Sequence, residues 1–393
     1  MVMSMMAKRE ITNVVRVRYA LADRTRKGII LDEFVASFGY CRKYAISLLG
    51  KPSQAAPPRR RRLRERLYPS SLMGPLVVIW EACNHICSRR LKPFLPEIIG
   101  RLEHFNHLRL SDKERQLLTQ MSVSTLERLL KRIREDRRPH GRCSTRPSFD
   151  LKQAIPIRTF GAEPRKDPGH LELDLVAHCG PTLSGDYVCT LDTIDMATCW
   201  CECIVPAGRG QVAVLAALKE LRDRLPFPLL SIDSDNDGSF INGHLFRYCQ
   251  QEKITFSRSR PYKKNDQAHV EQKNWSIVRQ LLGYDRYETG AVPALNALYK
   301  DYRLYVNFFQ PVLKLQSKTR VDARVRKVYD EAQTPYRRVL ASASVSDQSK
   351  AKLTMLYEQI DPVTLKEKVD RCQTEIWEKC RVRLLHEATT PPK

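Results

Sequence analysis

The sequence predicts a multidomain protein with an all-α N-terminal region, an α/β core containing a mixed five-stranded sheet, and a helical C-terminal region. Apolar residues recur at helical spacing up to about residue 136. From residue 168 the sequence alternates between strand-like segments and amphipathic helices, and residues 311–393 are again helical and charged. With 393 residues, the chain is long enough for two or three domains with separate cores.

Residues 1–50 are predicted to form a helix-turn-helix-like domain. The segment ILDEFVASFGYCRKYAISLLG has apolar spacing near that of a helix, and Gly39 interrupts it. A helix, a turn containing glycine and a second helix that carries Arg42 and Lys43 is the arrangement of helix-turn-helix proteins. These two cations are therefore candidate DNA contacts, although many small helical pairs share this pattern.

Residues 51–67 are predicted to be a basic linker, and residues 68–138 a second helical domain. The linker ends in a run of arginines, which would be either a solvated charge run or, as we favour, a set of phosphate contacts. Ser-x-x-Glu at 111–114 and 124–127 predicts two capping boxes, and hence two helices that would form a second helix-turn-helix. The candidate DNA contacts of these two regions are Arg59, Arg60, Arg61, Arg62, Arg128, Lys131 and Arg132.

One pattern in the second helical domain allows a metal site. Cys83-x3-Cys87 is followed by His104-x2-His107, and such spacings can bind zinc. Both pairs lie in amphipathic helical sequence, where buried cysteines and half-exposed histidines are ordinary. We therefore favour structural roles for these side chains, and we expect the cysteines to be reduced thiols of a cytoplasmic protein.

A second basic linker is predicted at 139–167, and an α/β core at 168–310. The order of its elements is β-β-β-α-β-α-β-α, which starts antiparallel and continues through parallel crossovers. This is the ribonuclease-H-like order. The expected strands are 171–179, 187–194, 198–205, 229–235 and 254–259, and the expected helices are 211–225, 241–253 and 269–284.

Three carboxylates fall on separate elements of this core. In open α/β sheets, chemistry tends to lie beyond the carboxyl ends of parallel strands, where Asp235 is expected. Asp174 lies in the first strand between two leucines, and Glu271 lies on the helix after the last strand. Three converging acids repel one another unless a cation lies between them. The hard cation Mg²⁺ (or Mn²⁺) suits oxygen ligands, and two such ions would clamp the attacking and leaving oxygens at phosphorus.

Other acids near these positions are rivals or structural residues. Asp233 lies on the same strand face as Asp235, and Asp237 lies in the turn that follows, so both are rival ligands. Asp235 is favoured by its position at the end of the strand. Asp192 and Asp195 are interpreted as edge or turn residues. Glu172 shares the strand face of Asp174 and could support it, but exposure at the surface is favoured.

The charge balance predicts a polyanionic partner. The chain has 67 Lys+Arg against 44 Asp+Glu, a formal net charge of +23. No apolar run approaches the ~20 residues needed to span a bilayer, so nucleic acid is expected rather than a membrane; the family resemblance given below implies that this nucleic acid is double-stranded DNA. Tyr262 and Trp275 could stack on a splayed base, with core packing an equal alternative for Trp275. The candidate DNA contacts around Glu271 are Arg258, Arg260, Lys263, Lys264, Lys273 and Asn274.

The three acids resemble the Asp, Asp, Glu triad of the integrase core that retroviral integrases and bacterial insertion-sequence transposases share. Asp174 lies in LELDLVAH, Asp235 in DSDNDGSFIN and Glu271 in HVEQKN. The separation of 35 residues between the last two is that of the D,D(35)E branch. The resemblance covers roughly 168–310. One departure is DNDGSF, where the family has DNGSEF, so the turn after the strand is expected to differ in shape.

The resemblance implies a transposase of a bacterial mobile element. Such an enzyme binds element ends and target DNA, cleaves a phosphodiester to free a 3′-hydroxyl, and joins that hydroxyl to target DNA as a homo-oligomer. It would act in the bacterial cytoplasm, at the nucleoid. Two alternatives remain: a catalytically inactive DNA-binding regulator derived from a transposase, for which the altered turn is the support, and another nuclease with the ribonuclease-H fold.

Overall fold

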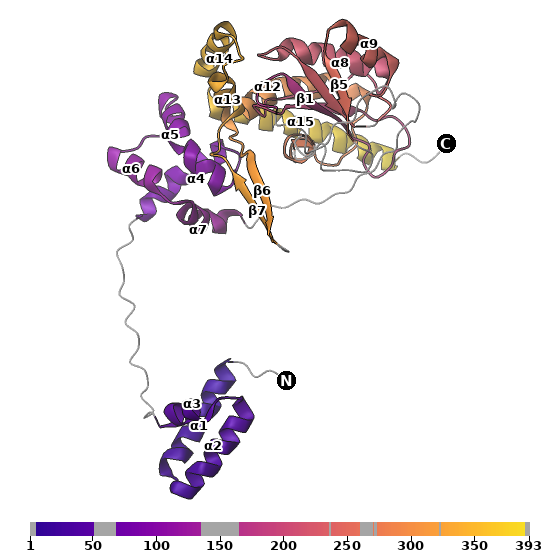
Figure 1. The fold of residues 1–393 in the computed structure, drawn as a ribbon. Coiled ribbons are helices and arrows are strands. Elements are labelled where there is room, and N and C mark those ends of the chain that lie inside the picture. The colour runs from indigo at the N-terminus through magenta and orange to yellow at the C-terminus, as the bar shows by residue number, and fades with distance from the viewer. Residues whose placement is uncertain are drawn as a thin grey trace. The chain divides into compact units, whose positions relative to one another are not determined.

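The computed structural model describes residues 5–50, 68–134, 165–235, 237–259, 270, 273–321 and 324–389. The chain divides into two compact units, Met1–Leu67 and Tyr68–Lys393 (Figure 1). The predicted linkers at 51–67 and 139–167 lie outside the described residues, except for the last three positions of the second linker.

The described part of the first unit, residues 5–50, contains three helices, α1 (Met5–Leu21), α2 (Arg24–Phe38) and α3 (Arg42–Leu49). Gly39 ends α2 in the left-handed conformation with φ of 67°, which glycine adopts without strain. Its N–H donates to Val35 O (2.9 Å). Apolar residues of all three helices pack together around Phe34. The predicted helix, glycine turn and second helix are therefore present.

The second unit begins with a helical segment. Its elements are the short 3-10 helix η1 (Ser70–Leu72) and the α-helices α4 (Met73–Ala82), α5 (Ser88–His104), α6 (Asp112–Gln120) and α7 (Val123–Arg134). The predicted capping box of Ser111 and Glu114 is confirmed at the start of α6. The capping box predicted at Ser124 is wrong, because α7 begins at Val123 and Ser124 therefore lies inside the helix. The capping acceptor is instead Ser122 Oγ, which accepts the N–H of Thr125 (3.2 Å).

The cysteines and histidines considered for zinc have structural surroundings. Cys83 is fully buried, and burial raises the pKa of its thiol to about 12. Cys87 is exposed at the start of α5, and His107 Nε2 lies 2.7 Å from Asp361 Oδ2. Among the described residues, no group of three or more His, Cys, Asp or Glu could hold a metal ion.

A five-stranded mixed sheet forms the centre of the second unit. Its order is β3-β2-β1-β4-β5, antiparallel across β1–β2 and β2–β3 and parallel across β1–β4 and β4–β5. This agrees with the predicted order. The strands are β1 (His170–Ala177), β2 (Cys189–Asp195), β3 (Cys201–Ile204), β4 (Ser231–Ser234) and β5 (Thr255–Arg258).

Helices cover both faces of this sheet. On one face Leu173 and Ile232 pack with residues of α8 (Gln211–Arg224) and α9 (Gly243–Gln251). On the other, Val176 packs with Val278 and residues of α12 (Val292–Phe309). The side chains of β1 thus alternate between two cores, which is the basis of its apolar alternation in the sequence.

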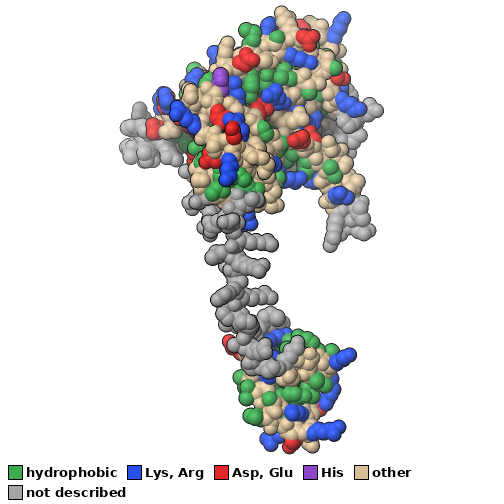
Figure 2. Space-filling model, turned by 90° about the vertical axis from the view of Figure 1, so that its left-hand side faces the viewer, with side chains coloured by type: hydrophobic (Ala, Val, Ile, Leu, Met, Phe, Trp, Pro, Cys, Tyr) green, Lys and Arg blue, Asp and Glu red, His purple; other side chains and the backbone are tan. Residues whose placement is uncertain are grey.

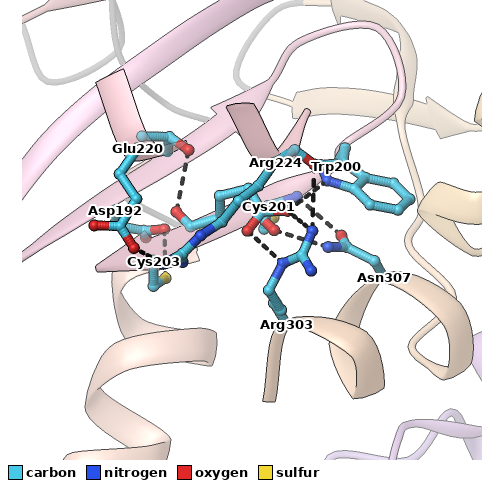
Figure 3. Close-up of polar contacts among 10 residues, drawn as sticks. Asp192, Trp200, Cys201, Cys203, Glu220, Arg224, Arg303 and Asn307 are labelled. Atoms are coloured by element: carbon cyan, nitrogen blue, oxygen red, sulfur yellow. Dashed lines mark hydrogen bonds and ion pairs between the residues drawn. The ribbon is translucent and has the colours of Figure 1, made fainter. Parts of the chain in front are cut away.

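Helix α12 also protects the outer edge of the sheet. Asn307 Oδ1 accepts the N–H of Cys201 (2.9 Å), and its Nδ2 donates to Cys201 O (2.8 Å) (Figure 3). Asn296 makes the same pair of hydrogen bonds with Val205, at 2.7 and 2.9 Å. These side-chain amides satisfy backbone groups along the edge strand β3, which would otherwise be open to pairing with another chain.

The C-terminal region, 311–393, was predicted to be helical, and this prediction is wrong for its first part. It begins with an antiparallel hairpin of β6 (Leu315–Val321) and β7 (Arg324–Tyr329). The described side chains of these strands are exposed except for half-buried Tyr329, so no alternation of buried and exposed residues marks the strands in the sequence. The helices that follow are α13 (Pro335–Ala341), α14 (Asp347–Gln359) and α15 (Pro362–Thr389), and α15 packs against α12.

Candidate functional site

Asp174 and Asp235 lie side by side where the parallel pairing of β1 and β4 ends. The last residues paired in this ladder are Leu173 and Ser234. Asp174 and Asp235 are the next residues of two strands whose backbones run about 4.8 Å apart. Both are half-buried. The register therefore sets two of the three predicted positions next to each other in sequence order beyond the paired residues, at the edge where chemistry was expected.

Hydrogen bonds fix the orientation of the Asp174 carboxylate. Its Oδ1 accepts the N–H of Leu175 (2.8 Å), and its Oδ2 accepts a hydrogen bond from Asn274 Nδ2. Burial raises the pKa of Asp174, and the charge of Asp237 adds to this, while the two hydrogen bonds and Arg279 act in the opposite direction. A carboxylate with a raised pKa is incompletely compensated, and a bound cation would stabilise its charged form.

The turn after β4 bears on the choice among the neighbouring aspartates. Asp235 Oδ1 accepts the N–H of Asp237 (2.9 Å), and Asp237 Oδ1 accepts the N–H of Ser239 (2.8 Å). Asp237 remains a rival ligand to Asp235, because its charge also contributes to the raised pKa of Asp174 on β1. Asp233 is buried, and Ser257 Oγ donates to its Oδ1, so its carboxylate is engaged inside the sheet.

Glu271 lies outside the described residues, but residues on either side of it contact β1. Val270 N–H donates to Glu172 Oε2 (3.0 Å), and Asn274 donates to Asp174. Asn274 begins η4 (Asn274–Arg279), a π-helical segment that continues into α11 (Gln280–Leu282). Three predicted cations of the preceding loop also lie outside the described residues: Arg260, Lys263 and Lys264.

Asp192 is the main residue of this region that the sequence interpretation missed. It lies directly opposite Asp174 in the β1–β2 ladder and is fully buried, not at an edge or in a turn. Cys203 Sγ donates to its Oδ1 (3.2 Å), and its Oδ2 has no hydrogen-bond partner among the described residues. Burial raises the pKa of Asp192 to about 7, and the charge of Asp174 adds to this rise. The hydrogen bond from Cys203 and the charge of Lys273 act in the opposite direction.

Asp192→Asn is expected to stabilise the metal-free protein more at pH 8 than at pH 5. The folded pKa of about 7 exceeds the unfolded value, so the unfolded state releases its proton first and stability falls as pH rises through this window. Asparagine has no such dependence, and the advantage of the variant should grow by about 2–3 kcal/mol between the two pH values. Urea unfolding of both proteins in EDTA measures this difference. An equal advantage at both pH values would show that Asp192 titrates normally.

Two other acids are also buried, which corrects their interpretation as edge, turn or exposed residues. Asp195 Oδ1 accepts the N–H groups of Gly169 (2.8 Å) and His170 (3.1 Å), and its Oδ2 accepts the N–H and the hydroxyl of Thr198. These bonds fix the chain at the start of β1. Glu172 is 3% exposed and holds the segment before η4 through Val270.

The predicted DNA contacts differ in exposure. Arg258 and Lys273 are each 8% exposed, and Lys273 acts on buried Asp192 and Cys201, so these two do not present an open cationic surface as predicted. Four predicted contacts are exposed: Arg42, Lys43, Arg128 and Lys131. The side chains of the others in the helical regions lie outside the described residues: Arg59, Arg60, Arg61, Arg62 and Arg132.

Three more side chains lie just after β1 or on η4. Arg279 Nη2 donates to Ala177 O (3.0 Å) on β1. His178 is fully buried with Nε2 beside Thr190 Oγ1 (2.8 Å), and burial lowers its pKa to about 3, so it remains neutral and structural. Trp275 is 53% exposed, which excludes the core-packing alternative and leaves its ring available at the surface.

The donor set at this edge fits a hard divalent cation. Asp174 and Asp235 supply carboxylate oxygens from adjacent strands, the ligands that Mg²⁺ and Mn²⁺ prefer. Burial raises the pKa of Asp174 despite the opposing charge of Arg279, and a bound divalent cation would stabilise the ionised carboxylate further. Within the described part of the chain, no helix combines the length and apolarity needed to cross a membrane.

Comparison with known proteins gives one sequence relative and several structural likenesses. No family model matches the chain. It is 42% identical over 336 residues to the uncharacterized protein y4rM of Sinorhizobium fredii (strain NBRC 101917 / NGR234), covering 85% of this chain and 95% of that protein.

The structural likenesses are to catalytic core domains of retroviral integrases. The BIV integrase core has a TM-score of 0.29 at 16% identity and covers 43% of this chain and 91% of its own. The HTLV-2 integrase core in complex with magnesium, in its dimeric form, has a TM-score of 0.28 at 16% identity and covers 37% and 90%. Because these scores are low, the fold rests on this chain's own strand order and register.

Proposed function

We propose that this chain, which belongs to the same family as the uncharacterized protein y4rM of Sinorhizobium fredii, is a DNA transposase or integrase. The observation that carries the proposal is the position of Asp174 and Asp235, side by side where the pairing of two parallel strands ends. The hydrogen bond from Asn274 to Asp174 supports the inclusion of Glu271, because Asn274 is only three residues farther along the chain.

In the proposed mechanism, Asp174, Asp235 and Glu271 would hold one or two Mg²⁺ (or Mn²⁺) ions. When bound, these would supply charge neutralisation at the reacting phosphate and activation of the attacking hydroxyl. The protein's own contribution is orientation. Asn274 and the N–H of Leu175 fix the Asp174 carboxylate, and the N–H of Asp237 fixes Asp235.

No covalent enzyme intermediate is needed for such a displacement, because water or a DNA 3′-hydroxyl is the nucleophile. The buried thiols near the sheet agree with this assignment. Burial raises the pKa of Cys201 and of Cys203, so both remain protonated and poorly nucleophilic.

Exposed cations on the helices are proposed to bind DNA outside the catalytic edge. Arg42 and Lys43 begin α3, the second helix of the proposed helix-turn-helix in the first unit, and Arg128 and Lys131 line α7. Each phosphate contact would add a salt-dependent increment of affinity. Exposed Trp275 is proposed to stack on a base at a DNA end. Because two element ends are handled together, we propose a homo-oligomer on DNA, in the bacterial cytoplasm.

The function is tested by incubating the full-length protein with duplex DNA that carries the ends of the mobile element. We expect cleavage and strand transfer that require Mg²⁺ or Mn²⁺ and that are lost in Glu271→Gln, while DNA affinity in EDTA is unchanged. DNA binding without cleavage in the parent protein would favour the regulator, the alternative that the DNDGSF turn supports. Preferential cleavage of an RNA–DNA hybrid or a four-way junction would favour another ribonuclease-H-fold nuclease.

A further inference from the structure

The β6–β7 hairpin, residues 315–329, is basic along both strands. The strands contain five cations and no acidic residue: Lys318, Arg320, Arg324, Arg326 and Lys327. By contrast, on the face of the second unit that Figure 2 shows, Lys and Arg side chains lie interspersed with Asp and Glu. The two strands therefore carry charge of one sign, whereas the face in Figure 2 carries both signs.

The register of the hairpin places like charges together. Lys318 lies directly opposite Lys327, and Thr319 lies opposite Arg326. Directly opposed residues share one face of a ribbon, and successive residues of a strand point to opposite faces. Lys318 and Lys327 therefore lie on one face and Arg326 on the other, all three exposed. Because opposed like charges are destabilising, an anionic partner would stabilise this arrangement.

The base of the hairpin is fixed to the body of the second unit. Lys314 N–H donates to Asp330 Oδ1 (2.6 Å), and Asp330 N–H donates to Lys314 O (2.9 Å). Arg338 Nη1 of α13 pairs with Asp330 Oδ2 (2.7 Å). Beyond this base, the two strands project away from the helices (Figure 1). The hairpin is thus a ribbon held at one end and exposed on both faces.

We propose that the β6–β7 hairpin is an arm that enters a groove of duplex DNA and contacts the phosphates of both groove walls. The major groove, about 12 Å wide, admits a two-stranded ribbon. Cations on both faces would meet the phosphate backbones on both sides. A flat anionic surface such as a membrane would contact one face only, so the two-sided charge favours DNA. The inference rests on the proposed function for its DNA partner, and adds a contact surface to it.

The test compares two triple variants of the full-length protein, each of which removes two lysines and one arginine from exposed positions. The arm variant is Lys318→Gln/Arg326→Gln/Lys327→Gln, and the control is Lys300→Gln/Lys352→Gln/Arg371→Gln. Both are titrated in EDTA against a duplex carrying an element end and against an unrelated duplex, between about 50 and 200 mM salt. Thermal unfolding of both variants checks that the fold is retained.

For the arm variant, the slope of log Kd against log salt is expected to fall by about 2–3, since each lost phosphate contact removes about 0.9. The control should keep the parent slope. A loss on both duplexes identifies backbone contacts, and a loss on the element end alone identifies end recognition. An unchanged slope for the arm variant would overturn the arm and leave the proposed function intact. Conversely, a parent that depends on the arm for binding but never cleaves DNA would overturn the function and leave the arm.

Discussion

Asp235→Asn is expected to lower the rate of Mg²⁺-dependent DNA cleavage by about 10³-fold, whereas Asp237→Asn is expected to lower it by no more than about 10-fold. A metal at the reacting phosphate stabilises the transition state by several kcal/mol, and about 1.36 kcal/mol corresponds to a tenfold change in rate. Asp235 follows the last paired residue of β4, beside Asp174. Asp237 lies in the turn, where its Oδ1 already accepts the N–H of Ser239 (2.8 Å).

Asparagine is a matched replacement at Asp235, because its Oδ1 can still accept the N–H of Asp237 and keep the turn in place. A loss of activity would then report the lost carboxylate charge and not a change of fold. Thermal unfolding and DNA affinity in EDTA should equal those of the parent protein. If Asp237→Asn proves to be the inactive variant and Asp235→Asn cleaves DNA, the ligand assignment moves to Asp237.

Arg303→Met is expected to lower the free energy of unfolding by about 3–5 kcal/mol, because it leaves a buried carboxylate without its counter-charge. Glu202 of β3 has a fully buried side chain, and Arg303 of α12 pairs with both of its oxygens at 2.6 Å. Trp200 Nε1 also donates to Glu202 Oε1 (2.9 Å). Figure 3 shows the Arg303 side chain reaching from the helix to this strand. Urea unfolding followed by circular dichroism measures the change.

Two controls separate this explanation from a simple loss of packing. The double variant Glu202→Gln/Arg303→Met removes both charges and should recover most of the lost stability, since a neutral pair needs no counter-charge. Arg115→Met breaks an exposed pair with Glu103, at 2.7 Å and 46% exposure of the arginine side chain, and should cost at most about 1 kcal/mol. If the double variant is as unstable as Arg303→Met, packing explains the loss.

The sequence predicted helices and strands correctly where burial of one side of the element produces a periodic apolar pattern. β1 alternates between two apolar cores, and α8 has an apolar stripe against the sheet, so the element order and the mixed sheet could be predicted. Gly39 and the Ser111 cap also have local causes, a left-handed residue and a side-chain acceptor. By contrast, the β6–β7 hairpin shows no such pattern, because the described side chains of its strands are exposed except for half-buried Tyr329.

The chemistry of the core depended more strongly on tertiary structure. Asp192 and Asp195 look like ordinary polar residues near a strand end, and only the pairing of β2 between β1 and β3 makes them buried. Lys273 was predicted to contact DNA phosphate, yet it is 8% exposed and directly precedes η4, which packs on β1. Its charge acts to lower the pKa of buried Asp192. Whether a charged side chain faces solvent or a buried partner is decided by elements far apart in the chain.

Within the core, the amino-acid sequence alone determined which segments are strands, and it identified two acids that fall at one edge of the sheet, because these depend on local periodicity and strand order. The tertiary structure decided how those acids are held. The β1–β4 register sets Asp174 beside Asp235, and Asn274 orients the first of them from a distant helix. Register and packing are set by contacts between distant segments, and no local pattern encodes them.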